Sequence, residues 1–323
     1  FYVCYKLKSI PFIDTSKGTS FNSMFANCVS IVEFPDLNCN AGTVFSSMFT
    51  GCRSMIKSPA LILNPLLTKS FTNMFDSCVS MIEFVNINTM QGSAYNNMFL
   101  NCHSLRILPE IINTSGSINN VNFGGMFQNC YDLEKAPMVD FSKGSSCFSI
   151  FASCWSISEF PAYDFSSATV LTSAFGTCLS LKRLPVMTIG SGITSFNTCF
   201  TTCSSLEEAP NWNLQNATDV TNMFNGCGNL RKVPAYNLSS VTVNSTQMFA
   251  NNLSLIKVDV VGMKRTHSYA NCKLSRTELV NIFNNLGVAV GSQSITISGN
   301  YGASQLTAGE RAIATGKGFT LIG

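Results

Sequence analysis

Cysteine is the residue type with the most potential for chemistry in this chain, and the 323 residues include 14 of them. Thiolates bind zinc, and thiols form disulfides or act as nucleophiles. Zinc sites use close pairs such as C-x₂-C, whereas ten of these cysteines follow one another at intervals of 24 to 28 residues. Such even spacing predicts one structural unit repeated in series. The spaced cysteines are Cys4, Cys28, Cys52, Cys78, Cys102, Cys130, Cys154, Cys178, Cys203 and Cys227.

The cysteine column also argues against disulfides. Side chains at the same position of stacked units point the same way, which suits disulfide geometry poorly. We therefore expect reduced, buried thiols that fill a narrow interior slot. Four cysteines lie off the column, and for them the redox state stays open, with Cys199 and Cys203 the first pair to check. The off-column residues are Cys39, Cys147, Cys199 and Cys272.

Other residues that could carry chemistry are few. The chain has two histidines, and we expect His103, next to a column cysteine, at the surface rather than in a metal site. Gly316-Lys317-Gly318 lacks the upstream glycine and the Ser or Thr of a phosphate-binding loop, so a helix end explains it better. No Ser/His/Asp or Cys/His set has a workable spacing, and we expect no enzyme, no cofactor and no metal.

Each column cysteine lies inside a longer motif, Phe-x-x-Cys-x-Ser-Leu-x-x-φ-Pro, usually with Met before Phe. In the unit of Cys52 the motif residues are Phe49, Met55 and Pro59, and an apolar residue, Leu61, follows two positions later. The eleventh unit is degenerate, with Asn at the cysteine position (252) and Asp at the proline position (259). The apolar column after the proline comprises Ile13, Leu37, Leu61, Ile87, Ile111, Val139, Tyr163, Met187, Trp212 and Tyr236.

A unit of this kind cannot bury its apolar residues alone, and stacking buries them against the neighbouring units. We predict a brief extended rung up to the proline, a polar turn, and then a short helical turn. The helical turn is expected because aromatic pairs such as Phe21 and Phe25 have the i, i+4 spacing of one helix face. Trp212, Tyr163 and Tyr236 could form a sugar-stacking platform, but their place in the apolar column favours core packing.

Charged residues form a second column, two positions after the aliphatic residue of each unit. Its sign alternates along most of the chain, so neighbouring rungs should bring opposite charges together and discourage a slip by one whole unit. A partner-docking stripe is the alternative, although alternating signs cancel beyond a Debye length. The column comprises Glu33, Lys57, Glu83, Ile107, Lys135, Glu159, Arg183, Glu208, Lys232 and Lys257.

The pattern changes after residue 260, and we divide the chain into a repeat region, 1–260, and a capping segment, 261–323. Ser275 and Glu278 predict a capping box, followed by a helix with apolar residues from Leu279 to Leu286 and a stop at Gly287. A strand at 295–297, a second helix at 307–315 ended by Gly316, and a strand at 319–322 complete two helix–strand units. Solenoids need such terminal units.

Composition excludes several classes of function. A net charge of +3 is too small to indicate nucleic-acid binding, and no apolar run is long enough to span a bilayer. The five sequons, at Asn113, Asn216, Asn237, Asn244 and Asn252, are expected by chance in a chain this rich in Asn, Ser and Thr. The chain opens at Phe1 inside a repeat and without a signal peptide, which suggests a fragment of a longer protein.

The repeat, as it stands in Phe175 to Pro185 and in Met223 to Pro234, resembles the leucine-rich repeats of BspA-like bacterial surface proteins. The segment from Leu274 to Phe319 looks like the terminal segment that accompanies such repeats in bacteriophage virion proteins and some bacterial surface proteins. The resemblance implies an α/β solenoid of about 11 units with parallel rungs, and a role in adhesion or attachment.

Three functions remain from the sequence. The first is a virion-associated module, such as part of a tail fibre, that contacts a glycan or protein of the host surface. The second is a bacterial or protist cell-surface adhesin, and the third is a structural decoration of a capsid or filament. All three place the chain in a larger assembly, on a virion or at a cell surface, and none identifies the binding residues.

Overall fold

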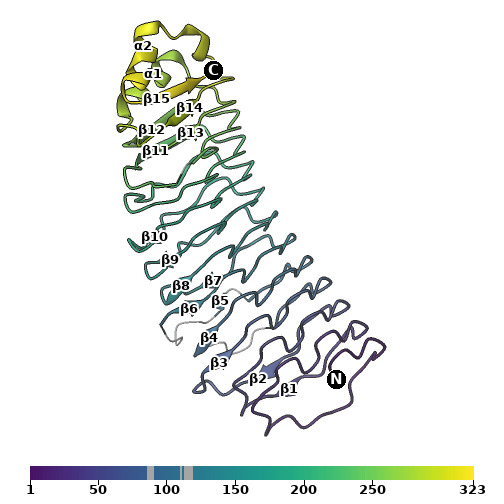
Figure 1. The fold of residues 1–323 in the computed structure, drawn as a ribbon. Coiled ribbons are helices and arrows are strands. Elements are labelled where there is room, and N and C mark those ends of the chain that lie inside the picture. The colour runs from purple at the N-terminus through teal and green to yellow at the C-terminus, as the bar shows by residue number, and fades with distance from the viewer. Residues whose placement is uncertain (86–90, 110, 113–118, 244) are drawn as a thin grey trace. The chain divides into compact units, whose positions relative to one another are not determined.

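The protein is built from short strands and turns in a pattern that repeats about every 24 residues. The computed structural model describes residues 1–85, 91–109, 111–112, 119–243 and 245–323. The chain divides into two compact units, Phe1–Ala168 and Thr169–Gly323. Within each unit, successive repeats lie one above another as turns of a solenoid (Figure 1). This confirms the predicted solenoid with parallel rungs.

Unit 1 contains strands of two or three residues that pair in parallel between turns. The register in β1 and β2 sets Leu37 opposite Leu61, so the apolar column predicted from the sequence stacks on itself. The sheets have the orders β1-β2, β3-β4-β6-β8 and β5-β7. The strands are β1 Leu37–Asn38, β2 Leu61–Ile62, β3 Lys69–Ser70, β4 Gly92–Ala94, β5 Ile111–Ile112, β6 Val121–Asn122, β7 Met138–Val139, β8 Gly144–Ser146 and β9 Asp164–Phe165.

Unit 2 begins with the same short turns and ends in longer elements. Strands β11 and β12 pair in parallel, as do β13, β14 and β15, and the two helices lie beside the last strands (Figure 1). The elements are β10 Thr188–Ile189, β11 Lys232–Asn237, β12 Lys257–Val261, β13 His267–Ser268, α1 Arg276–Asn285, β14 Gln293–Thr296, η1 Ala303–Gln305, α2 Ala308–Gly316 and β15 Phe319–Ile322.

The segment from the first aromatic position to the cysteine of each repeat, such as Phe21 to Cys28, is a series of tight turns and not the predicted helical turn. In the first complete example, the N–H of Cys28 donates to the carbonyl of Phe25, three residues back. Asn27, between them, has φ 59°, and Ser23 has φ 54°. A positive φ at the third residue of a turn is the signature of type II, and Asn, Ser or Gly tolerates it best. We call this part of each repeat the tight segment.

Tight segments of successive turns are joined by a regular backbone ladder. The N–H groups of Phe21, Ser23, Phe25 and Asn27 donate to carbonyls of the next turn at 2.7 to 3.0 Å. Their aromatic rings follow the same register: Phe25 stacks on Phe49 with ring centroids 5.6 Å apart. Both aromatic positions therefore face inward as expected, although the backbone that holds them is not helical.

The capping segment agrees with the predicted elements but differs in how the helices begin and end. Ser275 caps α1 by accepting from the N–H of Glu278, yet the Glu278 carboxylate instead accepts from the N–H of Val258 in β12. The full capping box occurs at α2, between Thr307 and Glu310. Gly287 does not adopt the left-handed conformation expected of a helix stop. A Cβ at this position would lie 2.8 Å from Lys264 Cγ, so the close packing of Lys264 requires glycine here.

Candidate binding surface

The column cysteines are free thiols and, apart from Cys4, they are buried, as the sequence predicted. In eight of them the Sγ–H donates to the carbonyl of the key aromatic one turn earlier, at 3.0 to 3.2 Å; Cys102, for example, donates to Phe75 at 3.1 Å. Burial raises the pKa of the Cys102 thiol well above its ordinary value, so the reactive thiolate is suppressed. Cysteine is thus both a small apolar filler and a hydrogen-bond donor.

The off-column cysteines are also free and buried. Burial raises the pKa of Cys39 to about 11 and that of Cys147 to about 12. Cys199, the first residue of the pair to check, forms no disulfide with Cys203. The prediction that Cys272 lies off the column was wrong. Its Sγ donates to the carbonyl of Phe249 at 3.1 Å, which is the contact made by a column cysteine. The unit between Asn252 and Cys272 is only 20 residues long.

The histidines differ from each other. His103 is half-buried at the surface, as predicted, and stacks on Tyr131 with ring centroids 4.5 Å apart. His267 is fully buried; desolvation lowers its pKa to about 4, and its Nε2 has no hydrogen-bond partner among the described residues. In the described part of the chain, no group of three His, Cys, Asp or Glu side chains is arranged to hold a metal ion.

Lys317 is held by the end of a helix and not poised for phosphate. Its Nζ donates to the carbonyls of Phe283, Asn284 and Leu286 at 2.6 to 3.1 Å, which satisfies the carboxyl end of α1. The left-handed residue of this turn is Gly318, with φ 88°. Gly316-Lys317-Gly318 therefore ends a helix, as predicted, although α2 includes Gly316 and the left-handed glycine is Gly318.

The charge column forms some of the ion pairs that its alternation predicts. Lys57 Nζ lies 2.7 Å from Glu83 Oε1, and Arg183 lies 3.6 Å from Glu208. Among the described residues, however, neither Lys135 nor Glu159 makes an ion pair. The exposed pairs contribute only about 0.2–1 kcal/mol each. Part of the column is thus left available for a partner.

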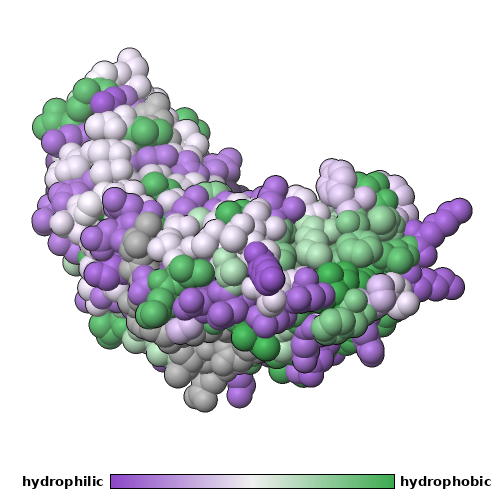
Figure 2. Space-filling model, turned by 90° about the horizontal axis from the view of Figure 1, so that it is seen from below, coloured by the Kyte–Doolittle hydropathy of each residue, from purple (hydrophilic) through white to green (hydrophobic). Residues whose placement is uncertain are grey.

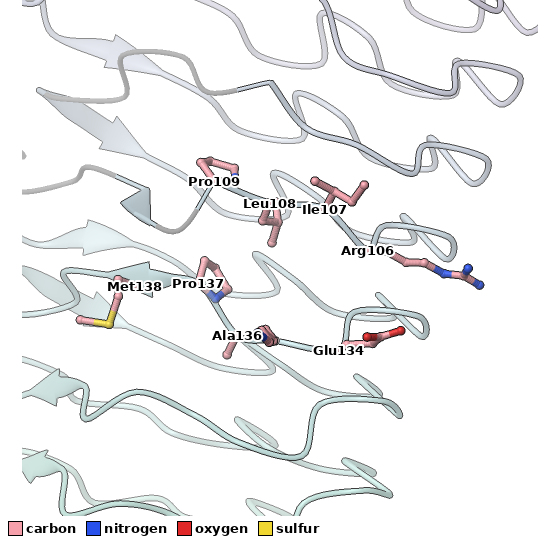
Figure 3. A pocket seen from close by; sticks show the side chains of 9 residues that line it. Arg106, Ile107, Leu108, Pro109, Glu134, Ala136, Pro137 and Met138 are labelled. Atoms are coloured by element: carbon pink, nitrogen blue, oxygen red, sulfur yellow. The ribbon is translucent and has the colours of Figure 1, made fainter.

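A groove lies on the rung side of unit 1, where these unpaired charges occur. One hollow of about 570 Å³ is lined by Arg106 to Pro109 of one turn and Glu134 to Met138 of the next. Figure 3 shows the side chains of the two turns facing the same hollow. A second hollow of about 610 Å³ shares Glu134, Lys135 and Ala136 with the first and continues to Pro161. Together they form one groove across three turns, which we call the open-rung groove.

The backbone opens at the same place. In earlier turns of unit 1, rungs are joined directly, as where the N–H of Phe84 donates to the carbonyl of Ile107 at 2.9 Å. Within the described ranges, no backbone hydrogen bond joins 106–109 to 133–137, or 133–137 to 157–161. The first two rungs do pair further along, where β5 lies parallel to β7, and the tight segments of these turns also remain paired.

Three planar side chains occupy one motif position in the three turns that form the groove. His103, Tyr131 and Trp155 each follow a column cysteine, and the rings form a continuous stack: Tyr131 and Trp155 have centroids 4.0 Å apart and planes 14° apart. Trp155 is 42% exposed. Sequence analysis did not identify this stack, although three consecutive aromatic or imidazole residues at one motif position were a usable signal.

Smaller hollows repeat the arrangement elsewhere. One in unit 1 is lined by Glu33, Lys57 and Pro59, and one of about 320 Å³ in unit 2 by Arg183, Glu208 and neighbouring residues. Apolar patches interleave with polar residues on the surface in Figure 2. Tyr163, Trp212 and Tyr236 are buried, which confirms core packing over a sugar platform. The predicted core residue Ile87, the side chain of Ile111, and the sequons at Asn113 and Asn244 lie outside the described residues.

None of the described helices has the length and apolar character needed to cross a membrane. Comparison with solved structures finds a leucine-rich repeat protein from Bacteroides ovatus at 18% identity, covering 100% of this chain and 86% of that chain, with a TM-score of 0.50. This chain has a leucine-rich-repeat-type solenoid fold. Residues 145–260 match the family described as Mycoplasma protein of unknown function, DUF285.

Two further solved structures match with lower similarity. A leucine-rich cell surface protein from Faecalibacterium prausnitzii is 18% identical over 75% of this chain and 76% of that chain, with a TM-score of 0.36. An internalin from Listeria monocytogenes is 13% identical over 91% and 80%, with a TM-score of 0.28. A search of curated proteins found no match.

Proposed function

We propose that this solenoid is a non-enzymatic binding module displayed at a cell surface, where it adheres to a protein or glycan partner. The observation that carries the proposal is the open-rung groove, an accessible hollow over three turns with unpaired charges and exposed apolar residues. Concave sites with a few polar groups are the usual places of ligand binding. The sequence resemblance to bacterial surface repeats supports the same function.

A binding role also agrees with the state of the residues that could do chemistry. The column thiols are buried and held by carbonyl acceptors, Lys317 is held by α1, and His267 is enclosed in the core of unit 2. The accessible polar groups of the groove are the carboxylates of Glu134 and Glu159 and the amine of Lys135. These bind and orient a partner without requiring a nucleophile or a general base.

A second candidate, attachment on a virion, is favoured by the cysteines. All 14 are free thiols, a state suited to assembly in a reducing cytoplasm. The resemblance of the C-terminal segment to virion-associated repeats supports it as well. A purely structural role in a capsid or filament would be distinguished by other subunits covering the groove in the assembled particle.

We further propose that residues 261–323 serve as the cap of the repeat region 1–260. The capped helices α1 and α2 lie beside the terminal parallel strands and replace the short repeated turns. Terminal units with a polar outer face keep a solenoid soluble. The cap would leave the rung side of the repeats accessible to a partner within a larger assembly.

The function is tested by locating the intact gene product and measuring its binding. Antibodies against the folded chain should label the surface of unpermeabilised cells that express it, and the purified chain should bind saturably to target cells. Labelling of viral particles alone would favour the second candidate. Label confined to the cell interior, with no binding to any cell tested, would contradict both.

A further inference from the structure

In the ring stack, the faces that the three rings turn towards one another are covered. Centroid separations of 4.5 Å and 4.0 Å leave no space for a sugar ring between His103, Tyr131 and Trp155. Sugar recognition by stacking needs a free aromatic face. The rings instead offer apolar contact together with two hydrogen-bond donors, the Tyr131 hydroxyl and the Trp155 Nε1–H. Tyr and Trp with this combination are typical anchors of protein–protein interfaces.

Resting on the proposed function, we propose that the open-rung groove binds a polypeptide segment that carries an apolar side chain next to a basic one, with Trp155 and Tyr131 as anchors. The apolar part follows from the first hollow. Ile107 is 55% exposed and Met138 is 47% exposed at its wall, and Pro109 and Pro137 complete it. These side chains gain most from covering by another apolar group.

The basic part follows from the charges of the second hollow. Its lining includes Glu134, Glu159 and a single cation, Lys135, and none of the three forms an ion pair in the described part of the chain. Arg106, beside the first hollow, is already paired with Asp132 at 2.7 Å. The second hollow therefore carries one excess negative charge, which a Lys or Arg of the partner complements.

The shape of the groove makes an extended polypeptide a suitable occupant. Among the described residues no backbone hydrogen bond joins 133–137 to 106–109 or to 157–161, although the first two rungs pair just beyond, where β5 lies parallel to β7. The two hollows select side chains, as pockets do in other modes of extended-peptide recognition. Three turns at about 4.8 Å spacing span about 10 Å, the length of three extended residues.

The full chain provides its own reporter because it contains two tryptophans that differ in exposure. Trp155 is 42% exposed beside the groove, whereas Trp212 is 5% exposed in unit 2. With ¹⁵N-labelled indoles, the peptide acetyl-Gly-Leu-Lys-Leu-Lys-Gly-amide should shift the Trp155 signal saturably and leave the Trp212 signal in place. The Leu-Glu counterpart of this peptide and chitohexaose should shift neither.

Matched variants test the same assignment through affinity, measured by anisotropy of the fluorescein-labelled peptide. Trp155→Ser and Glu159→Gln should each weaken binding about tenfold. Leu253→Ser, at the same motif position in unit 2, and Glu33→Gln, in the charge column outside the groove, should bind as the parent does. Trp155→Phe, which keeps a ring in the stack, should fall between them.

Several results would overturn the proposal. These are a Trp155 signal that does not move at saturating peptide, preference for the Leu-Glu peptide or chitohexaose, and control variants that lose as much affinity as the groove variants. If Trp155→Ser still binds target cells like the parent, the groove assignment fails while the adhesion function stands. If the parent chain binds neither peptide nor cells, the proposed function itself fails.

Discussion

The tight segments and the rungs of the same turns have opposite properties. Between Tyr95–Asn101 and the next tight segment, four backbone hydrogen bonds of 2.9 to 3.0 Å form a continuous ladder. The rungs of these turns, 106–109 and 133–137, share no backbone hydrogen bond in the described structure. The tight segments therefore maintain the stack along their whole length, whereas the rungs pair only further along, at β5 and β7, which leaves 106–109 and 133–137 free to diverge and bind. The comparison predicts that substitutions on the two sides separate stability from binding.

The largest effect is expected from the aromatic core of the tight segment. Phe99 is fully buried between the rings of Phe75 and Phe127. Phe99→Ala should lower the free energy of unfolding by about 3–5 kcal/mol through lost burial and a cavity. Trp155→Ser, in the exposed ring stack, should lower it by only about 0.5–1.5 kcal/mol through lost stacking on Tyr131. Urea unfolding measures both, and equal losses would remove the distinction.

A pH effect comes next, from His267 in unit 2. Its folded pKa of about 4 lies below the ordinary value of 6.5, so the unfolded chain binds the proton more readily. Stability should therefore fall as pH drops from about 6.5 to 4, by up to about 3 kcal/mol. Unfolding curves across this range should show a shallower pH dependence for His267→Leu than for the parent. Parallel curves would mean that His267 is not buried as a neutral ring.

A smaller effect is expected where the backbone is left-handed. Asn101 has φ 59°, and its side chain accepts from Asn129. Asn101→Val should cost about 1–2 kcal/mol, because a β-branched residue is strained there. Asn101→Gly should cost less, since Gly51 and Gly226 occupy the equivalent positions of their turns with φ of 71° and 75°. Thermal unfolding of the two variants measures the difference, and a reversed order would contradict the turn assignment.

The smallest effect is that of a single thiol donor. Cys102→Val approximately preserves volume but removes the S–H that Phe75 accepts, leaving that carbonyl with the N–H of Cys78. The expected loss is about 1 kcal/mol. Cys102→Ser, which retains a donor, provides the comparison in the same unfolding assay. A Val variant as stable as the parent would reduce the cysteine to a space filler.

Much of the fold could be predicted because a period of 24 residues places like residues at like positions. Phe25, Cys28 and Leu37 are buried where their columns placed them. The helical turn was wrong because i, i+4 spacing does not distinguish a helix from two linked tight turns. The Asn, Ser or Gly that precedes most column cysteines, as at Asn27, Gly51 and Ser77, was the signal for left-handed backbone.

The binding surface was less accessible to sequence reasoning for a physical reason. Buried positions repeat the same residue types, but an exposed position such as that of Trp155 carries different residues in different turns. The gap between 106–109 and 133–137 depends on how rungs diverge along the stack, which no motif encodes. Cys272 was missed because Asn252 and a unit of 20 residues interrupt the period.

The most direct test of the account is a count of reactive thiols in the native protein. Of the 14 cysteines, Cys4 alone is not buried. A brief pulse of N-ethylmaleimide without reductant, followed by mass spectrometry, should add one label to the folded chain and 14 to the chain unfolded in guanidinium. Several labels in the folded state would contradict the interior stack of thiols. Fewer than 14 in the unfolded state would reveal disulfides and contradict the reduced column.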